Sequence, residues 1–277
     1  MSLHKLGLLI GAFVVAAGAP AHAEPIWSFS TGADYTSGKY GETVDTNILI
    51  VPFAATYSAE RWQFGVTVPY VQLDGSGNVI PGTGAGNGDV LNTASAGMLT
   101  TPGLLGSNPF APPAPTPSRI QEQGLGDVTL SLAATPYLAS SGARLTLSTD
   151  LRTPTGDAKR SLGAGQAVGA FTIGYAQPFG GRFDVYGSVG YQRAFKSNAD
   201  SLTATFGAET QATNRVLLGA SAAWAQASVD GRPNQTELSV YSGVDFNDHV
   251  RVAAYVLGGL TKSSPDIGAG LRLVLKP

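Results

Sequence analysis

The residues of this sequence with the most chemical potential are ionisable side chains that alternate with apolar ones. In GARLTLSTDLRTP, residues 142–154, two arginines and an aspartate alternate with leucines. Charges kept on one side of a strand either pair with one another or line a wet passage and select solutes by charge. The full set of candidate site residues is Asp34, Arg144, Asp150, Arg152, Glu209, Glu237, Tyr241, Asp245, Arg251, Tyr255 and Arg272.

The sequence lacks the residue constellations of an enzyme or a cofactor site. Its three histidines are His4, His22 and His249, and none is placed beside a serine as a hydrolase would need. No GxSxG elbow occurs, GADYTSGKYG misses the spacing of a phosphate loop, and DGSGN at 74–78 lacks the glutamate of a calcium loop. The chain also has no cysteine. We therefore predict no catalytic residue, no metal and no cofactor.

The first 23 residues have the pattern of a cleaved signal peptide. A basic start at His4 and Lys5 precedes the apolar run LGLLIGAFVVAA, and Ala21-His22-Ala23 is a small-x-small cleavage site. The run is short for a membrane helix, and an uncleaved anchor is the alternative. We expect the mature chain to begin at Glu24 and to be exported.

The composition indicates a surface that water does not fully cover. Only 13% of the residues are charged, whereas an ordinary soluble domain has about a quarter. The formal net charge is −2, so the chain has no basic surplus that would point to nucleic acid. Something other than water is expected to face much of the protein.

Apolar residues recur with period two along the chain, which is typical of strands and not of helices. In residues 142–154, for example, Leu145, Leu147 and Leu151 share one parity. The alternation predicts twelve strands, near 26–36, 46–58, 61–73, 124–138, 142–154, 166–178, 182–195, 202–212, 215–227, 235–246, 250–261 and 266–276.

A soluble β-sandwich also alternates, and three further features favour a membrane barrel. The predicted strands reach the roughly 9–11 residues that a tilted strand needs to cross a bilayer. Aromatic residues such as Trp27, Tyr57 and Trp62 stand near strand ends, as interfacial girdles require. Connections alternate between short turns (SAE, ASS, FGG, TN and NDH) and longer loops, the longest being residues 74–123. Outer-membrane barrels have short periplasmic turns and long extracellular loops.

The barrel prediction fixes several local expectations. Across the turn NDH, Asp245 and Arg251 should face each other on neighbouring strands and form a salt bridge. Pro52, Pro69 and Pro136 fall inside predicted strands, where each removes a ladder hydrogen bond, so we expect bulges or strand ends there. Inward glycines and serines, among them Gly32, Ser188, Gly190, Ser221, Ser239, Gly268 and Gly270, should leave room in the lumen.

The order of several motifs resembles a known family. GLGDVTLSLAATPYL, then LSTDLRTPTGDAKRSLGAGQ, YGSVGYQRAF and SSPDIGAGLRLVL are similar to the outer-membrane barrels labelled "MetA-pathway of phenol degradation" proteins. The closest matches are Gly124–Asp127, Pro154–Gly156 and Ser264–Asp266. The resemblance implies an exported barrel with a role in the passage of small compounds, aromatic ones among them, and it carries no known catalytic or binding residue.

These observations together predict an all-β protein: a single antiparallel transmembrane barrel of about twelve strands over residues 24–277, with the long extracellular loop 74–123. We expect it in the outer membrane as a pore or passive transporter for small aromatic or hydrophobic molecules. A closed structural or adhesive barrel is the alternative, and a soluble sandwich is a second. Expected partners are outer-membrane lipid, the barrel-assembly machinery with periplasmic chaperones, and an unknown solute.

Overall fold

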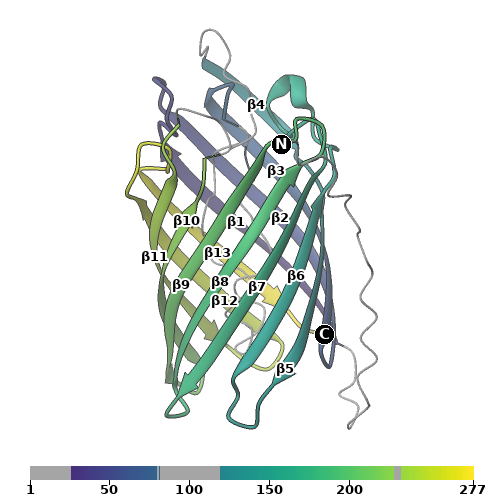
Figure 1. The fold of residues 1–277 in the computed structure, drawn as a ribbon, viewed down its shortest axis with the longest axis vertical. Helices are drawn as coiled ribbons and strands as arrows, with labels where there is room; N and C mark the ends of the chain where they lie inside the picture. The colour runs from purple at the N-terminus through teal and green to yellow at the C-terminus, as the bar shows by residue number, and fades with distance from the viewer. Residues whose placement is uncertain (1–25, 80, 82–118, 228–231) are drawn as a thin grey trace, which may run out of the picture.

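The computed structural model describes residues 26–79, 81, 119–227 and 232–277, and it forms an all-β, closed antiparallel barrel of 12 strands (Figure 1). Because side chains alternate along each strand, the sheet has one apolar and one polar face. Closing this sheet into a barrel puts the polar face inside and leaves no free strand edge. The strands are β1 (Ile26–Gly38), β2 (Thr46–Ala59), β3 (Trp62–Ser76), β4 (Arg119–Leu125), β5 (Thr129–Leu138), β6 (Arg144–Arg152), β7 (Val168–Phe179), β8 (Phe183–Ala194), β9 (Asp200–Thr213), β10 (Val216–Ala225), β11 (Gln235–Asp245), β12 (Val250–Gly259) and β13 (Ile267–Leu275).

Thirteen strand segments make twelve positions in the wall because β4 and β5 share one. β4 pairs with residues 70–76 of β3, and β5 pairs with residues 62–67 of the same strand. All other neighbours follow the chain order, and β1 pairs with β13 to close the ring. The predicted fourth strand, 124–138, is thus at the correct position in the wall, but it is wrong as a single strand, because the chain leaves the ladder between β4 and β5.

The break between β4 and β5 lies opposite Pro69 of β3. The pairing with β3 passes from Thr67–Thr129 to Tyr70–Leu125, a shift of one residue, and Pro69 lies in the gap. The predicted loop 74–123 is shorter than expected at both ends, because residues 74–76 and 119–123 belong to strands. Most of its length lies outside the described residues.

The prolines only partly follow the expectation of bulges or strand ends. Pro136 lies at a register shift between β5 and β6, as expected. Pro69 also follows it, because the register of β3 with β5 and β4 shifts by one residue at this position. The expectation is wrong for Pro52, which faces Pro69 in the uninterrupted register of β2 and β3. Neither proline has an N–H, so the two form a non-hydrogen-bonded pair. The donors that they lack would have pointed away from each other, from Pro52 toward β1 and from Pro69 toward β4–β5. The ladders to β1 and to β4–β5 are interrupted there.

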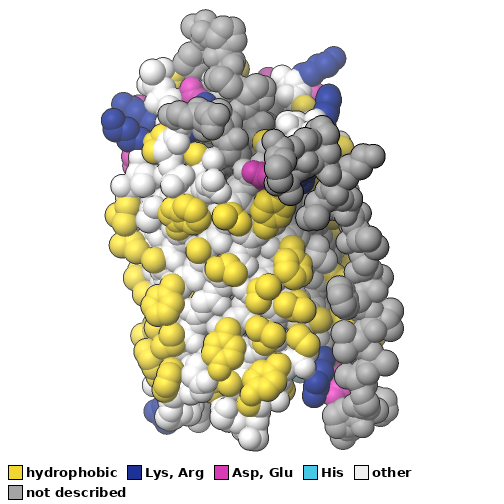
Figure 2. Space-filling model, viewed as in Figure 1, with side chains coloured by type: hydrophobic (Ala, Val, Ile, Leu, Met, Phe, Trp, Pro, Cys, Tyr) yellow, Lys and Arg dark blue, Asp and Glu magenta, His cyan; other side chains and the backbone are white. Residues whose placement is uncertain are grey.

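The outer face of the wall is apolar, and it is the parity that the sequence assigned to lipid. Figure 2 shows hydrophobic side chains spread over the middle of the barrel, with charged groups gathered at its two ends. Phe206, Val189 and Leu271 are among the large side chains exposed there. Trp27 and Tyr57 pack with ring centroids 5.2 Å apart near one end, where interfacial aromatic rings belong. Among the described residues, no helix is long and apolar enough to cross a membrane.

The two ends of the barrel differ in their connections, as predicted. The short-turn end carries the connections 60–61, 139–143, 180–182, 214–215 and 246–249. The long-loop end carries 39–45, 77–118, 153–167, 195–199, 226–234 and 260–266. In an outer-membrane barrel the short turns face the periplasm.

Candidate functional site

The predicted site residues all lie on the inward side of the wall. The register places Asp34 opposite Gly270, and Arg144 opposite Ala176, on the parity that alternates with the exposed apolar side chains. The strands bring most of the set into three charged groups and the Asp245–Arg251 pair, and Glu237 is buried on the inward face of β11. The role of these side chains in the passage of a solute stays a prediction.

The first group joins β1, β12 and β13. Asp34 accepts a hydrogen bond from the Arg272 guanidinium at 3.0 Å and another from the Tyr255 hydroxyl at 2.9 Å. The pair is nearly buried, with side-chain exposures of 14% for Arg272 and 8% for Asp34. Because both carboxylate oxygens are used, the group holds its three strands together.

The second group lies toward the short-turn end. The Tyr186 and Tyr241 hydroxyls are 2.8 Å apart, and Tyr241 donates to Glu209 at 3.0 Å. Arg144 lies 3.9 Å from Asp184 on β8. Tyr186 and Asp184 were not among the predicted residues, although both stand on the polar parity of their strand, and that parity is the signal that could have found them.

The predicted salt bridge across the turn NDH is present. Arg251 and Asp245 face each other in the register, and Arg251 Nε lies 3.6 Å from Asp245 Oδ1. The Arg251 side chain is almost completely buried, at 2% exposure, while Asp245 remains partly open. The bridge braces the wall close to the short-turn end.

The third group lies beside the break between β4 and β5. Arg152 and Asp150 point inward from β6, opposite Thr129 and Ser131 of β5. Asp127, which falls between the two strand segments, is buried and uses both carboxylate oxygens. It accepts from the backbone N–H of Gly156 at 2.9 Å and of Ala164 at 2.7 Å. Two motifs of the family resemblance, Gly124–Asp127 and Pro154–Gly156, are therefore in direct contact.

Inward glycines do not leave the free room that the sequence suggested. A Cβ on Gly270 would lie 2.2 Å from the Tyr255 ring, and one on Gly219 would lie 2.2 Å from the Tyr241 ring. Each tyrosine thus lies flat over a glycine of the neighbouring strand. The glycines make space for rings, and the rings line that side of the barrel.

A second inward region is apolar, and the sequence reasoning missed it. A buried cluster joins two strands and three connections: Tyr40, Ile48, Ile50, Val71, Leu73, Val79 and Leu162, with Ile120 packed against it. The run NILIVPF in β2 is apolar on both parities, so alternation could not separate its inward side chains from its outward ones. Burial raises the pKa of the Tyr40 phenol, whose hydroxyl donates to Thr36 Oγ1 at 2.6 Å. We call this set the mouth cluster.

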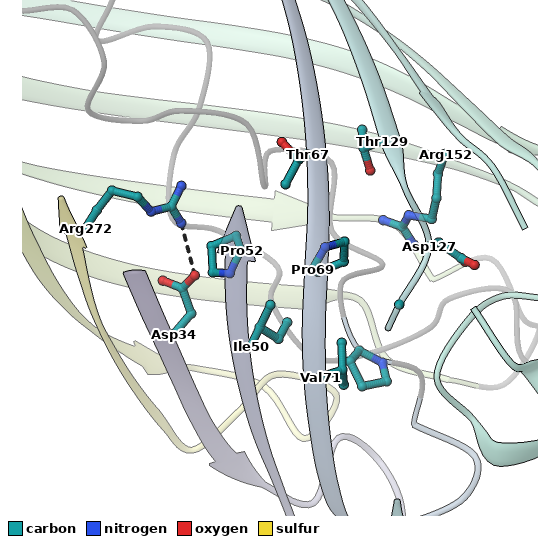
Figure 3. A pocket seen from close by; sticks show the side chains of 12 residues that line it. Asp34, Ile50, Pro52, Thr67, Pro69, Val71, Asp127, Thr129, Arg152 and Arg272 are labelled. Atoms are coloured by element: carbon teal, nitrogen blue, oxygen red, sulfur yellow. Dashed lines mark hydrogen bonds and ion pairs between the residues drawn. The ribbon is translucent and has the colours of Figure 1, made fainter. Parts of the chain in front are cut away.

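A crevice inside the wall lies between the charged groups and the mouth cluster. Figure 3 shows Asp34 and Arg272 on one side of Pro52 and Pro69, with Asp127 and Arg152 on the other. The crevice offers about 20 Å³ to the centres of water molecules, which is room for about one water. A solute larger than water would enter this crevice only if the side chains that line it moved.

Comparisons with known proteins bear on the fold. No protein-family model matches the chain, and no curated protein sequence does. The COG4313 outer membrane channel from Pseudomonas putida F1 is similar in structure, with a TM-score of 0.59 and 16% identity over 94% of this chain and 97% of that one. The β domain of the Bordetella autotransporter BrkA gives 0.50 and 12% identity, covering 91% and 99%. The toluene transporter TodX of P. putida gives 0.41 and 12% identity, covering 93% and 90%.

Proposed function

We propose that this protein is a passive outer-membrane channel for small aromatic or hydrophobic molecules. The observation that carries the proposal is the contrast inside one closed barrel: charged groups line most of the strands, and an apolar cluster stands at the long-loop end. In a channel, apolar side chains at one end of a polar lumen would favour an aromatic solute over small hydrated ions, because a narrow apolar constriction sheds water.

Two resemblances support the proposal. The motif order is similar to the family linked with phenol degradation, and the structural neighbour from P. putida F1 is described as an outer membrane channel. Movement would be diffusive, driven by the solute gradient, with outer-membrane lipid around the barrel. We also propose that periplasmic chaperones and the barrel-assembly machinery deliver the chain to the outer membrane.

A closed structural barrel is the second candidate. The paired charges and the tyrosine rings over glycines favour it, since both fill the interior with fixed side chains. It predicts negligible conductance from a correctly folded protein.

Planar-bilayer recording of the refolded protein tests the two candidates. Benzoate serves as the probe, because it is aromatic and, being ionised near neutral pH, carries current. A channel of the proposed kind gives steady currents, and its reversal potential between potassium benzoate and potassium chloride favours benzoate. No current from protein that shows a heat-modifiable gel shift would overturn the channel and leave the structural barrel.

A further inference from the structure

The connection between β6 and β7, residues 153–167, folds back against the wall. Leu162 near its middle is 2% exposed and belongs to the mouth cluster with Val71 and Leu73 of β3. Ser161 beside it donates to the Gly77 carbonyl at 2.7 Å. A loop that starts on β6 thus reaches past the position of β5 and contacts inward residues of β3.

This connection occupies a stretch of wall that has no strand ladder. Among the described residues, β4 pairs only with β3, so its second edge has no strand partner. The connection meets that edge with side chains instead: Arg160 binds Glu122 at 2.6 Å and the Gln123 carbonyl at 3.1 Å. A few side-chain contacts are easier to release than a row of ladder hydrogen bonds.

Asp127 holds the two ends of the connection together. Its carboxylate accepts from Gly156 near the start and from Ala164 near the end. Glycine is required at this approach, because a Cβ on Gly163 would lie 2.4 Å from Asp127 Oδ1. Thr155 adds a bond from the Val128 N–H at 2.8 Å. The residues between β4 and β5 therefore bind this connection and hold it in place.

We propose that residues 153–167 are the gate of the channel, with Asp127 as its latch and Leu162 as the side chain that determines selectivity. This inference rests on the proposed function. With the latch made, Leu162 closes the mouth cluster and solutes do not pass. With the latch released, the loop moves away from β3 and the mouth opens, and its apolar lining still favours a flat apolar solute over hydrated ions, because such a solute displaces little bound water. A fixed plug with the same contacts would never move.

A reversible crosslink distinguishes a gate from a fixed plug. A Cβ on Gly77 would lie 3.7 Å from Ser161 Oγ, within reach of a disulfide, and the chain has no cysteine of its own. In the double variant Gly77→Cys/Ser161→Cys, oxidation should reduce the benzoate current to background, and reduction should restore it. Each single variant is the matched control. Wild-type current from the oxidised double variant would overturn the gate.

Two further substitutions test the latch and the selecting side chain. Asp127→Asn replaces one acceptor oxygen by a donor that faces a backbone N–H, so we expect a conductance increase of about twofold or more. Leu162→Ala should raise chloride conductance and lower the preference for benzoate, because the constriction becomes wider and wetter. Leu125→Ala, which removes an outward side chain of β4 with 60% exposure, is the control and should change neither quantity.

The outcomes separate this inference from the function on which it rests. If the folded wild type and the Asp127→Asn variant are both silent, the channel itself is wrong. If the wild type conducts and neither Asp127→Asn nor Leu162→Ala alters current or selectivity, only the gate is wrong. The heat-modifiable gel shift of each variant confirms that the barrel has formed before its current is read.

Discussion

The charged groups of the strands and the mouth cluster are both inside the barrel, yet they are built differently. Apart from Asp127, the charged groups come from strand residues whose neighbours are fixed by register, as Asp34, Tyr255 and Arg272 are. The mouth cluster takes Tyr40, Val79 and Leu162 from connections, and only its other members from strands. A residue fixed by register cannot move without opening the sheet, whereas a loop residue can. The comparison suggests that the first region supports the barrel and that the second regulates passage.

The largest expected effect follows from removing one partner of a nearly buried pair. Asp34→Ala leaves the Arg272 guanidinium without its carboxylate and Tyr255 without its acceptor, and such losses cost about 3–5 kcal/mol. Urea unfolding of the refolded barrel in lipid vesicles measures the loss. The double variant Asp34→Ala/Arg272→Met should recover most of it, because no charge is left unpaired.

An exposed ion pair provides the control for that experiment. Arg119 and Asp74 form a pair at 2.8 Å, with Arg119 more than half exposed, and solvent screens such pairs. Asp74→Ala should leave the unfolding midpoint unchanged. An equal loss from both single variants would mean that interior pairs do not brace this wall, and the comparison would then be wrong.

The next effect concerns the glycines under the tyrosine rings. Gly219→Ala places a Cβ 2.2 Å from the Tyr241 ring, and overpacking of this kind costs about 1–3 kcal/mol. Gly187→Ala is the matched control, since the nearest atom to its Cβ is 3.4 Å away, and alanine loses less chain entropy than glycine in a strand. Unfolding measurements should therefore give opposite signs, and a stabilised Gly219→Ala would show that the ring moves freely.

A smaller loss of stability is expected in the mouth cluster, together with a change in passage. Val71→Thr keeps the shape of the side chain and adds a hydroxyl on the inward face of β3, so the cost in stability is about 1 kcal/mol. Conductance in potassium chloride should rise, because the constriction holds water more readily. Val66→Thr, on the outward face of the same strand, should leave conductance unchanged. A rise in both variants would place the effect outside the mouth.

Sequence reasoning reached most of the fold and only part of the interior, and the division has a physical reason. Strand positions and the Asp245–Arg251 bridge follow from period two and from a short turn, both of which are local. The contacts of Leu162 with β3 and of Asp127 with Gly156 join distant segments through irregular backbone, where no period applies. The motifs containing Asp127 and Gly156 were visible in the sequence, but their contact required the fold.

The smallest expected effect concerns Tyr40, by which the connection between β1 and β2 joins the mouth cluster. Tyr40→Phe keeps the buried ring and removes the hydroxyl that donates to Thr36 on β1, at a cost of about 0.5–1.5 kcal/mol near neutral pH. Burial raises the pKa of Tyr40 above its ordinary value of 10, so the unfolded chain loses this proton at a lower pH than the folded one does. The stability associated with the protonated phenol is complete below pH 10 and is lost as the pH rises above it. Urea unfolding at several alkaline pH values should therefore show the wild type losing stability more steeply than Tyr40→Phe, so that the two converge. Parallel curves would mean that the Tyr40 phenol is open to water, and the mouth cluster would then be looser on the side of this connection than its contacts with β2 and β3 imply.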